Sequence, residues 1–259
     1  MKKTLLALAA CTVLFVACDD TSSSPSTSEN KSSDQSKSCP NADEPLTDPR
    51  DGKVYRTVKI GDQIWMAENL NYETTSSWTN DSLDKDGSIY GRFYTFDASK
   101  KACPDGWHVP TSDEFDELRE NVGGIGLAGK NLKTTSGWDK SEEGKDGNGT
   151  DKYCFGIKAS GKSSNKEDGV YGVGKYTQLW TSTTFIRPEY DNYGNRTDRG
   201  RKGYYLPFTS SDSIQIESND LTYAWNIRCL KGDPEPEPIP SEDVSATVSG
   251  SLQQVIGQQ

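Results

Sequence analysis

Residues 101–122 constrain the fold of this chain more than any other stretch, because a turn, a short extended segment and a helix start follow one another there. The turn is Cys103-Pro104-Asp105-Gly106, in which proline presets φ and glycine accepts a positive φ. Trp107-His108-Val109 then predicts a short extended segment, which ends at Pro110.

A helix is predicted to begin at Thr111. Its hydroxyl can accept a hydrogen bond from the backbone N–H of Glu114, and the Glu114 carboxylate can accept one from the backbone N–H of Thr111. This reciprocal arrangement is a capping box. The residues that follow place one apolar face on the helix, formed by Phe115, Leu118 and Val122.

Composition limits how much of the chain can pack and what it can bind. Only 32% of the 259 residues are hydrophobic and the mean hydropathy is −0.80, so we expect part of the chain to lie outside a packed core. The net charge of −10 disfavours nucleic acid as a partner, because phosphates need a basic surface. The single histidine, His108, excludes a multi-histidine metal centre, and we expect it to be structural.

Residues 1–17 are predicted to form an export signal. Lys2 and Lys3 precede an apolar run that is too short to span a bilayer, and Phe15-Val16-Ala17-Cys18 resembles a bacterial lipobox. We therefore predict lipidation at Cys18, palmitate included, and a membrane anchor in the bacterial cell envelope, at the outer membrane or cell surface. A second box ending at Cys11 and an ordinary cleaved signal with an incidental Cys18 remain open.

Beyond the signal, we expect three regions: a Ser-rich tether over residues 18–47, a folded domain over residues 48–233, and a Pro/Glu spacer with a disordered tail over residues 234–259. Within the domain, a hairpin is predicted from strands 54–60 and 63–67, residues 90–102 pass from strand to short helix, and residues 127–132 form another short helix. Residues 134–176 read as long loops. Later strands are expected at 179–185, 203–208, 213–217 and 224–229, which together predict an α+β class.

If Cys18 carries lipid, four cysteines remain in the exported chain, and four allow three pairings. We favour Cys103–Cys229, which joins the helix entrance to the last strand. Cys39–Cys154 is then the remaining pair. A Cys39 that stays free or pairs with another molecule is the alternative.

Five blocks in the same order resemble the Fibrobacter succinogenes major paralogous domain and cover about residues 48–233. The blocks are Asp51-Gly52-Lys53-Val54-Tyr55 with Ile60-Gly61-Asp62-Gln63-Ile64-Trp65-Met66-Ala67-Glu68-Asn69-Leu70-Asn71-Tyr72; Tyr90-Gly91-Arg92-Phe93-Tyr94-Thr95-Phe96; Cys103-Pro104-Asp105-Gly106-Trp107-His108-Val109-Pro110; Leu179-Trp180-Thr181-Ser182; and Ile227-Arg228-Cys229.

The resemblance implies a C-type-lectin-like fold with short helices and antiparallel strands, in an exported lipoprotein or surface protein. It also implies a distant similarity to formylglycine-generating-enzyme-like domains, through residues 106–111. The family has no established activity. The chain departs from the family pattern in two places: the loop at Trp78 lacks a cysteine pair, and Cys154 stands where glycine is more usual, which supports a link to Cys39.

Motifs for catalysis and metal binding are weak. A lectin-type calcium site would need an acid after Trp225-Asn226, where Ile227 stands instead. No serine-hydrolase elbow, phosphate-binding glycine loop or HExxH occurs, and no close cysteine pair suits an oxidase. We therefore predict no catalytic residue, metal or cofactor.

Aromatic residues in the predicted loops are the candidate ligand-binding set, because exposed rings can stack on sugar faces. These are Trp78, Trp138, Tyr171, Tyr190 and Tyr193. The alternative is that these rings pin the loops to the domain. The leading hypothesis is a non-catalytic binding or adhesion module for polysaccharide. A structural or assembly partner of envelope proteins, and a formylglycine-generating-like or hydrolytic enzyme, are the two alternatives.

Overall fold

The computed structural model describes residues 39–186, 189–190, 193, 196–197 and 201–233. The predicted signal, the lipidation site Cys18 and the spacer of residues 234–259 lie outside this part of the chain. The elements along the described chain are β1 (Ala42–Thr47), β2 (Val54–Ile60), β3 (Gln63–Met66), β4 (Ser77–Trp78), β5 (Phe93–Thr95), α1 (Phe96–Ser99), β6 (Trp107–His108), α2 (Ser112–Asn121), α3 (Ala128–Leu132), β7 (Thr177–Ile186), β8 (Glu189–Tyr190), β9 (Arg196–Thr197), β10 (Arg201–Phe208), β11 (Glu217–Asp220), β12 (Ala224–Trp225) and β13 (Leu230–Lys231).

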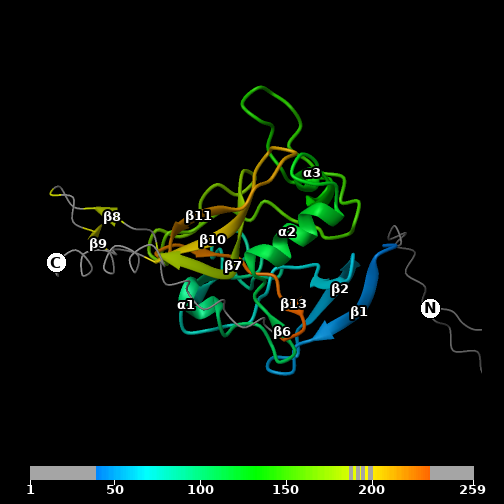
Figure 1. Cartoon of the computed structure of the whole chain (residues 1–259). Helices are drawn as coiled ribbons and strands as arrows, with labels where there is room; N and C mark the ends of the chain where they lie inside the picture. Colours follow the sequence, from blue (N-terminus) through cyan, green and yellow to red (C-terminus); the bar gives the residue numbers. More distant parts are fainter. Residues whose placement is uncertain (1–38, 187–188, 191–192, 194–195, 198–200, 234–259) are drawn as a thin grey trace, which may run out of the picture. The chain divides into compact units, whose positions relative to one another are not determined.

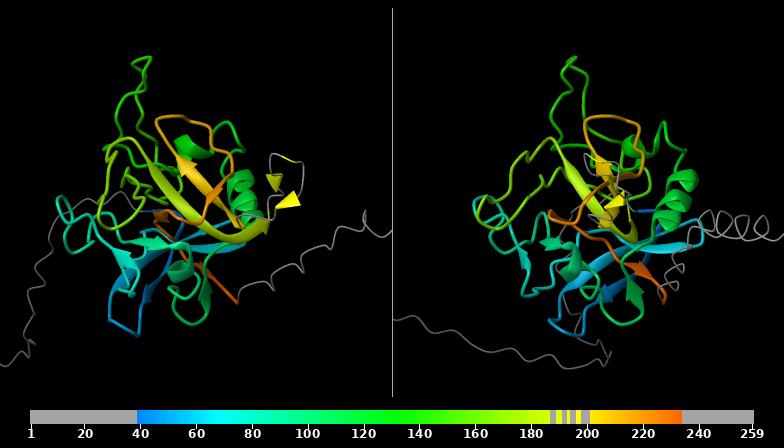
Figure 2. Two further views of the ribbon diagram at one scale, coloured as in Figure 1. Left: turned by 90° about the vertical axis from the view of Figure 1, so that its left-hand side faces the viewer. Right: turned by 60° about the vertical axis from the view of Figure 1, so that its left-hand side comes forward.

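Antiparallel strands dominate the architecture, and the helices are few and short, so the α+β class is confirmed. A five-stranded sheet has the order β1-β2-β3-β13-β6, and two three-stranded sheets have the orders β11-β10-β7 and β12-β5-β4. Strands β8 and β9 pair with each other. Figure 1 shows α2 between β7 and β10 on one side and β1 and β2 on the other, and Figure 2 shows the sheets from two further directions.

The predicted hairpin is confirmed as β2 and β3, which pair from Thr57↔Met66 to Ile60↔Gln63. Gly61 begins the two-residue turn with a φ of 61°, a backbone conformation that side chains with a Cβ rarely adopt. The predicted strand at residues 90–102 is β5, followed by α1. The capping box is also present, because both bonds between Thr111 and Glu114 form.

One strand corrects the domain boundary placed at residue 48. Strand β1 lies within the residues that we assigned to the tether, where it pairs antiparallel with β2 at the edge of the five-stranded sheet. The Thr57 hydroxyl donates to the Glu44 carbonyl at 2.7 Å, and Leu46 packs against the core. The sequence of β1 is charged and contains a proline, so it gives no local strand signal. The strand forms because β2 pairs with it.

Two later strands also differ from expectation. Residues 213–216 form no strand, because Ile214 turns into the core and its N–H donates to the Ile125 carbonyl instead, while β11 begins at Glu217. The strand expected over residues 224–229 divides into β12 and β13. Between them, the backbone of Asn226 bonds to Gln178 and Trp180 of β7.

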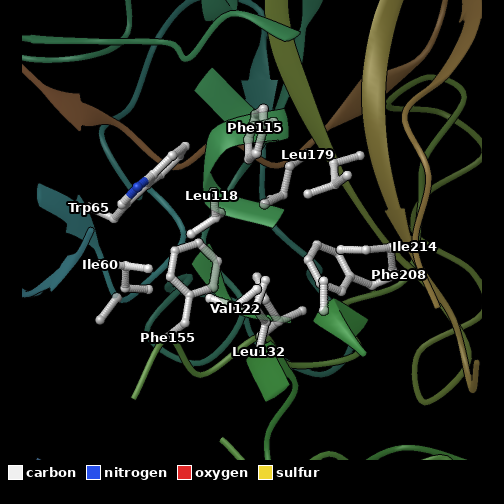
Figure 3. Packing of buried hydrophobic residues seen from close by; sticks show 14 of the residues in the cluster. Ile60, Trp65, Phe115, Leu118, Val122, Leu132, Phe155, Leu179, Phe208 and Ile214 are labelled. Atoms are coloured by element: carbon white, nitrogen blue, oxygen red, sulfur yellow. The ribbon is translucent and has the colours of Figure 1, made fainter. Parts of the chain in front are cut away.

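The apolar face of α2 closes the largest core cluster (Figure 3). This cluster lies between α2, the five-stranded sheet and the sheet of β11, β10 and β7. Trp65 is fully buried in this cluster, with ring centroids 5.1 Å from Phe115 and 5.8 Å from Phe155. Burying such large rings contributes roughly 2–3 kcal/mol each, before the entropy of ordering them is counted.

The favoured disulfide and the remaining pair both form. Cys103 pairs with Cys229, with Cα atoms 5.8 Å apart, and Cys39 pairs with Cys154, with Cα atoms 5.9 Å apart. The first links the turn before β6 to the residue before β13. The second ties the start of the described chain, just before β1, to the long loop region after α3.

Candidate functional site

Two loops that are distant in sequence meet beside β4 and enclose a polar hollow of about 170 Å³. The first loop follows Trp78, and the second precedes Tyr171. The hollow is lined by Trp78, Thr79, Asn80, Asp81, Ser82, Lys166, Asp168, Gly169 and Val170.

Trp78 joins the two loops. It stands on the edge strand β4, opposite Phe93 of β5, and its ring packs with Phe93, Ala224 and Val170. The indole Nε1–H donates to the Ser163 hydroxyl at 3.0 Å. Only 8% of Trp78 is exposed, so the residue lines the hollow without presenting an open ring face.

Hydrogen bonds within the first loop give it a defined shape. The buried Asp84 carboxylate accepts from the backbone N–H groups of Ile89, at 3.0 Å, and of Tyr90, at 2.6 Å. The Asp84 N–H in turn donates to the carbonyl of Asn80 at 2.8 Å. These bonds close the loop on itself, which leaves the side chains of Asp81 and Ser82 exposed at the hollow.

The second loop is organised around Ser163. Its hydroxyl donates to one of two nearby carbonyls, those of Asn165 and Gly169, both at 2.8 Å. The Asn165 amide donates to the Asp168 carboxylate at 2.7 Å, and the Asp168 N–H donates to Asn165 Oδ1 at 2.8 Å.

The hollow therefore presents carboxylates, hydroxyls and one ammonium group around an indole edge. Asn80 is 4% exposed, and its Nδ2 has no hydrogen-bond partner among the described residues. A buried amide donor usually has a partner, so a water or a ligand oxygen is expected to supply one. This chemistry suits a polyhydroxylated ligand, which both donates and accepts hydrogen bonds.

The five aromatic residues predicted to bind a ligand lie in different parts of the structure. Tyr171 is 43% exposed, follows Val170 of the hollow, and has the Lys162 ammonium 5.5 Å from its ring centroid. Tyr193 is 90% exposed, and Tyr190 belongs to β8, whose side chains lie outside the description. Of the five, Trp78 lines the hollow, and Tyr171 directly follows its lining residue Val170 in the chain.

Trp138 is a correction to the ligand-binding set. It is 5% exposed, belongs to the main core cluster, and its Nε1–H donates to the Ile157 carbonyl at 3.1 Å. Its ring cannot stack on a ligand, so it pins the long loop, as the alternative held. The lining residues that sequence reasoning missed are Asp81, Lys166 and Asp168, together with Ser163, which bonds to the Trp78 indole. Their only signal in the sequence was the polar composition of the two loops.

His108 has both ring nitrogens engaged. Nδ1 lies 2.9 Å from the Gly232 carbonyl, which can only accept, and Nε2 lies 2.8 Å from Glu114 Oε1. Burial favours the neutral ring, but Glu114 and Gly232 outweigh it and raise the pKa of His108 above its usual value. These two contacts of the His108 ring tie the chain after β13 to the capping box of α2.

Within the described ranges, no group of three or more histidine, cysteine or acidic side chains could hold a metal ion. None of the helices in this part of the chain has the length and apolar character needed to cross a bilayer.

A family model described as the Fibrobacter succinogenes major domain matches residues 58–231. The match begins inside β2, so β1 and Cys39 precede it, and it includes both loops of the hollow. No curated protein and no solved structure was found to match the chain.

Proposed function

The chain belongs to the Fibrobacter succinogenes major domain family, and from that premise we propose that it is a non-catalytic binding module that takes polysaccharide in the hollow beside Trp78. The single observation that carries the proposal is the hollow itself, which is lined by Asp81, Asp168 and Asn80 with its unpartnered amide, and whose lining residue Val170 is followed directly by the exposed Tyr171. Polysaccharide sites commonly combine one aromatic face with several polar groups.

Two further parts of the proposal come from the sequence. We propose that Cys18 is lipidated and holds the module on the bacterial cell envelope, which the lipobox-like run before it supports. We also propose a C-type-lectin-like fold, which the short helices, antiparallel strands and long loops of the described chain support.

Retention of the full-length chain on insoluble cellulose, xylan and chitin, with and without chelator, tests the binding role. We expect retention on one of them, insensitive to chelator. Asp81→Ala and Tyr171→Ala should weaken retention at least tenfold. The matched controls are Tyr193→Ala, an exposed tyrosine on the hairpin of β8 and β9, and Glu117→Ala, an exposed acid on α2.

The control variants distinguish binding at the hollow beside Trp78 from binding elsewhere on the protein. Retention lost equally in Tyr193→Ala would place binding away from the hollow and contradict the proposal. No retention on any polysaccharide would favour an assembly role with other envelope proteins instead.

A further inference from the structure

A second, smaller hollow is lined by residues from several segments that are distant in sequence. Its volume is about 20 Å³, and it is lined by Arg56, Ala67, Glu68, Asn69, Ile89, Gly156, Lys158 and Arg228. Three of these eight residues are cations and one is an acid, in a chain whose net charge is −10. The local charge is thus opposite to that of the whole molecule.

Arg228 lies against this hollow almost fully buried. Its Nε–H donates to Asn69 Oδ1 at 2.9 Å, Nη2 donates to the Gly156 carbonyl at 3.1 Å, and Nη1 donates to the Phe155 carbonyl. Among the described residues, no carboxylate lies within ion-pair distance of the guanidinium. Carbonyl oxygens satisfy donors, but they do not neutralise the charge.

Lys158 also lacks a carboxylate partner among the described residues, although it is only half-buried. Its ammonium donates to the Ile89 carbonyl at 3.1 Å and has no carboxylate partner within the described part of the chain. Burial lowers the pKa of Lys158, and the charge of Arg228 lowers it further. The one acid of the hollow, Glu68, already bonds to the side chain and backbone N–H of Arg56.

We propose that this hollow is a carboxylate-binding site, in which Lys158, Arg56 and Arg228 receive the anionic group of a ligand. A bound carboxylate supplies the negative charge that the buried Arg228 and the half-buried Lys158 lack. The size favours this group, because one water needs roughly 10–15 Å³, so the hollow holds one or two oxygen atoms and not the four of a sulfate.

Isothermal titration calorimetry of the full-length chain with sodium galacturonate and with N-acetylalanine tests the site, with galactose and sodium sulfate at matched ionic strength as references. Saturable binding of either carboxylate supports the proposal, and the tighter of the two tells whether an acidic sugar or a peptide end supplies the group. Absence of binding by both carboxylates, or equally tight binding of sulfate, overturns it.

Two variants with opposite expected signs sharpen the test. Lys158→Gln should weaken carboxylate binding at least tenfold, whereas Glu68→Gln should tighten it severalfold, because it removes the competing negative charge. Lys152→Gln, at an exposed lysine that does not line the hollow, is the matched control and should bind like the parent. Unchanged binding by both Lys158→Gln and Glu68→Gln would contradict the site.

If Lys158→Gln fails to fold, the exposed Arg56 offers a second cation of the hollow that can be removed. Arg56→Gln should also weaken binding. The inference stands apart from the proposed function, since Asp81 and Tyr171 do not line this hollow. Asp81→Ala and Tyr171→Ala should leave galacturonate binding unchanged, so either proposal can fail alone.

Discussion

Lys133 and Arg228 are both fully buried cations without a carboxylate partner among the described residues, yet their surroundings differ. The Lys133 ammonium donates to three carbonyls, those of Gly147 at 2.7 Å and of Thr209 and Ser211 at 2.9 Å. An ammonium has three N–H donors, so all of them are satisfied. Arg228 also bonds to carbonyls, but it adjoins a hollow that two other cations line.

The difference separates a structural cation from one that can meet a ligand. Lys133 ties the loop after α3 to the segment after β10, and its site is closed. Arg228 adds its charge to those of Lys158 and Arg56, and burial lowers its pKa to about 9. A buried charge is thus only a pointer to a ligand where space and further uncompensated charge adjoin it.

Lys133→Met should produce the largest loss of stability, about 4 kcal/mol in the free energy of unfolding, because three buried carbonyls lose their donor. Urea unfolding at pH 7 measures it. Lys130→Met, at a half-exposed lysine nearby that pairs with Asp212, should change stability by less than about 1 kcal/mol. A loss in Lys133→Met no larger than in this control would show that the three bonds contribute little.

Arg228→Met should cost less, about 2 kcal/mol, because the lost bonds are partly offset by relief of repulsion from Lys158 and Arg56. Without the neighbouring guanidinium, the pKa of Lys158 should rise toward its usual value. An NMR titration of the Lys158 side chain measures this shift. An unchanged Lys158 pKa would mean that the two cations do not interact across the hollow.

His108 completes the comparison as a buried titratable side chain that has its own carboxylate partner, Glu114. Its raised pKa means that its stabilisation is fully present below the unfolded value of about 6.5 and is lost as pH rises through the folded value. His108→Gln should therefore cost about 1–2 kcal/mol at pH 6 and progressively less at higher pH. Urea unfolding across pH 6–9 measures this. A penalty that does not change with pH would show that the ring is neutral in the folded protein.

Binding of galacturonate should distinguish Arg228 from His108 by its effect on the melting temperature. It should raise the melting temperature of the parent chain, but it should do so far less for Arg228→Met, and the rise should persist in His108→Gln. Differential scanning fluorimetry measures these shifts.

Local signals predicted the elements that local physics stabilises. The capping box, the apolar face of α2 and the hairpin of β2 and β3 depend on residues close in sequence, and all three are present. The pairings of Cys103 with Cys229 and of Cys39 with Cys154 are also as expected.

The predictions from sequence were wrong where contacts between residues distant in sequence decide the structure. Strand β1 exists because β2 pairs with it, and Ile214 lies in a core loop because it bonds to Ile125. Trp138 resembled an exposed loop aromatic, yet its indole finds the Ile157 carbonyl in the core. In each case a long-range contact overrides the local pattern.

The two hollows could not be found from the chain alone. Trp78 and Ser163 are 85 residues apart, and Arg56 and Arg228 come from opposite ends of the domain. The order of residues determined the turn and helix start at residues 101–122 and the family, because these depend on neighbours in sequence. Which aromatic rings are exposed, and which cations lack a counter-charge, was decided by folding, because burial and electrostatic pairing are properties of neighbours in space.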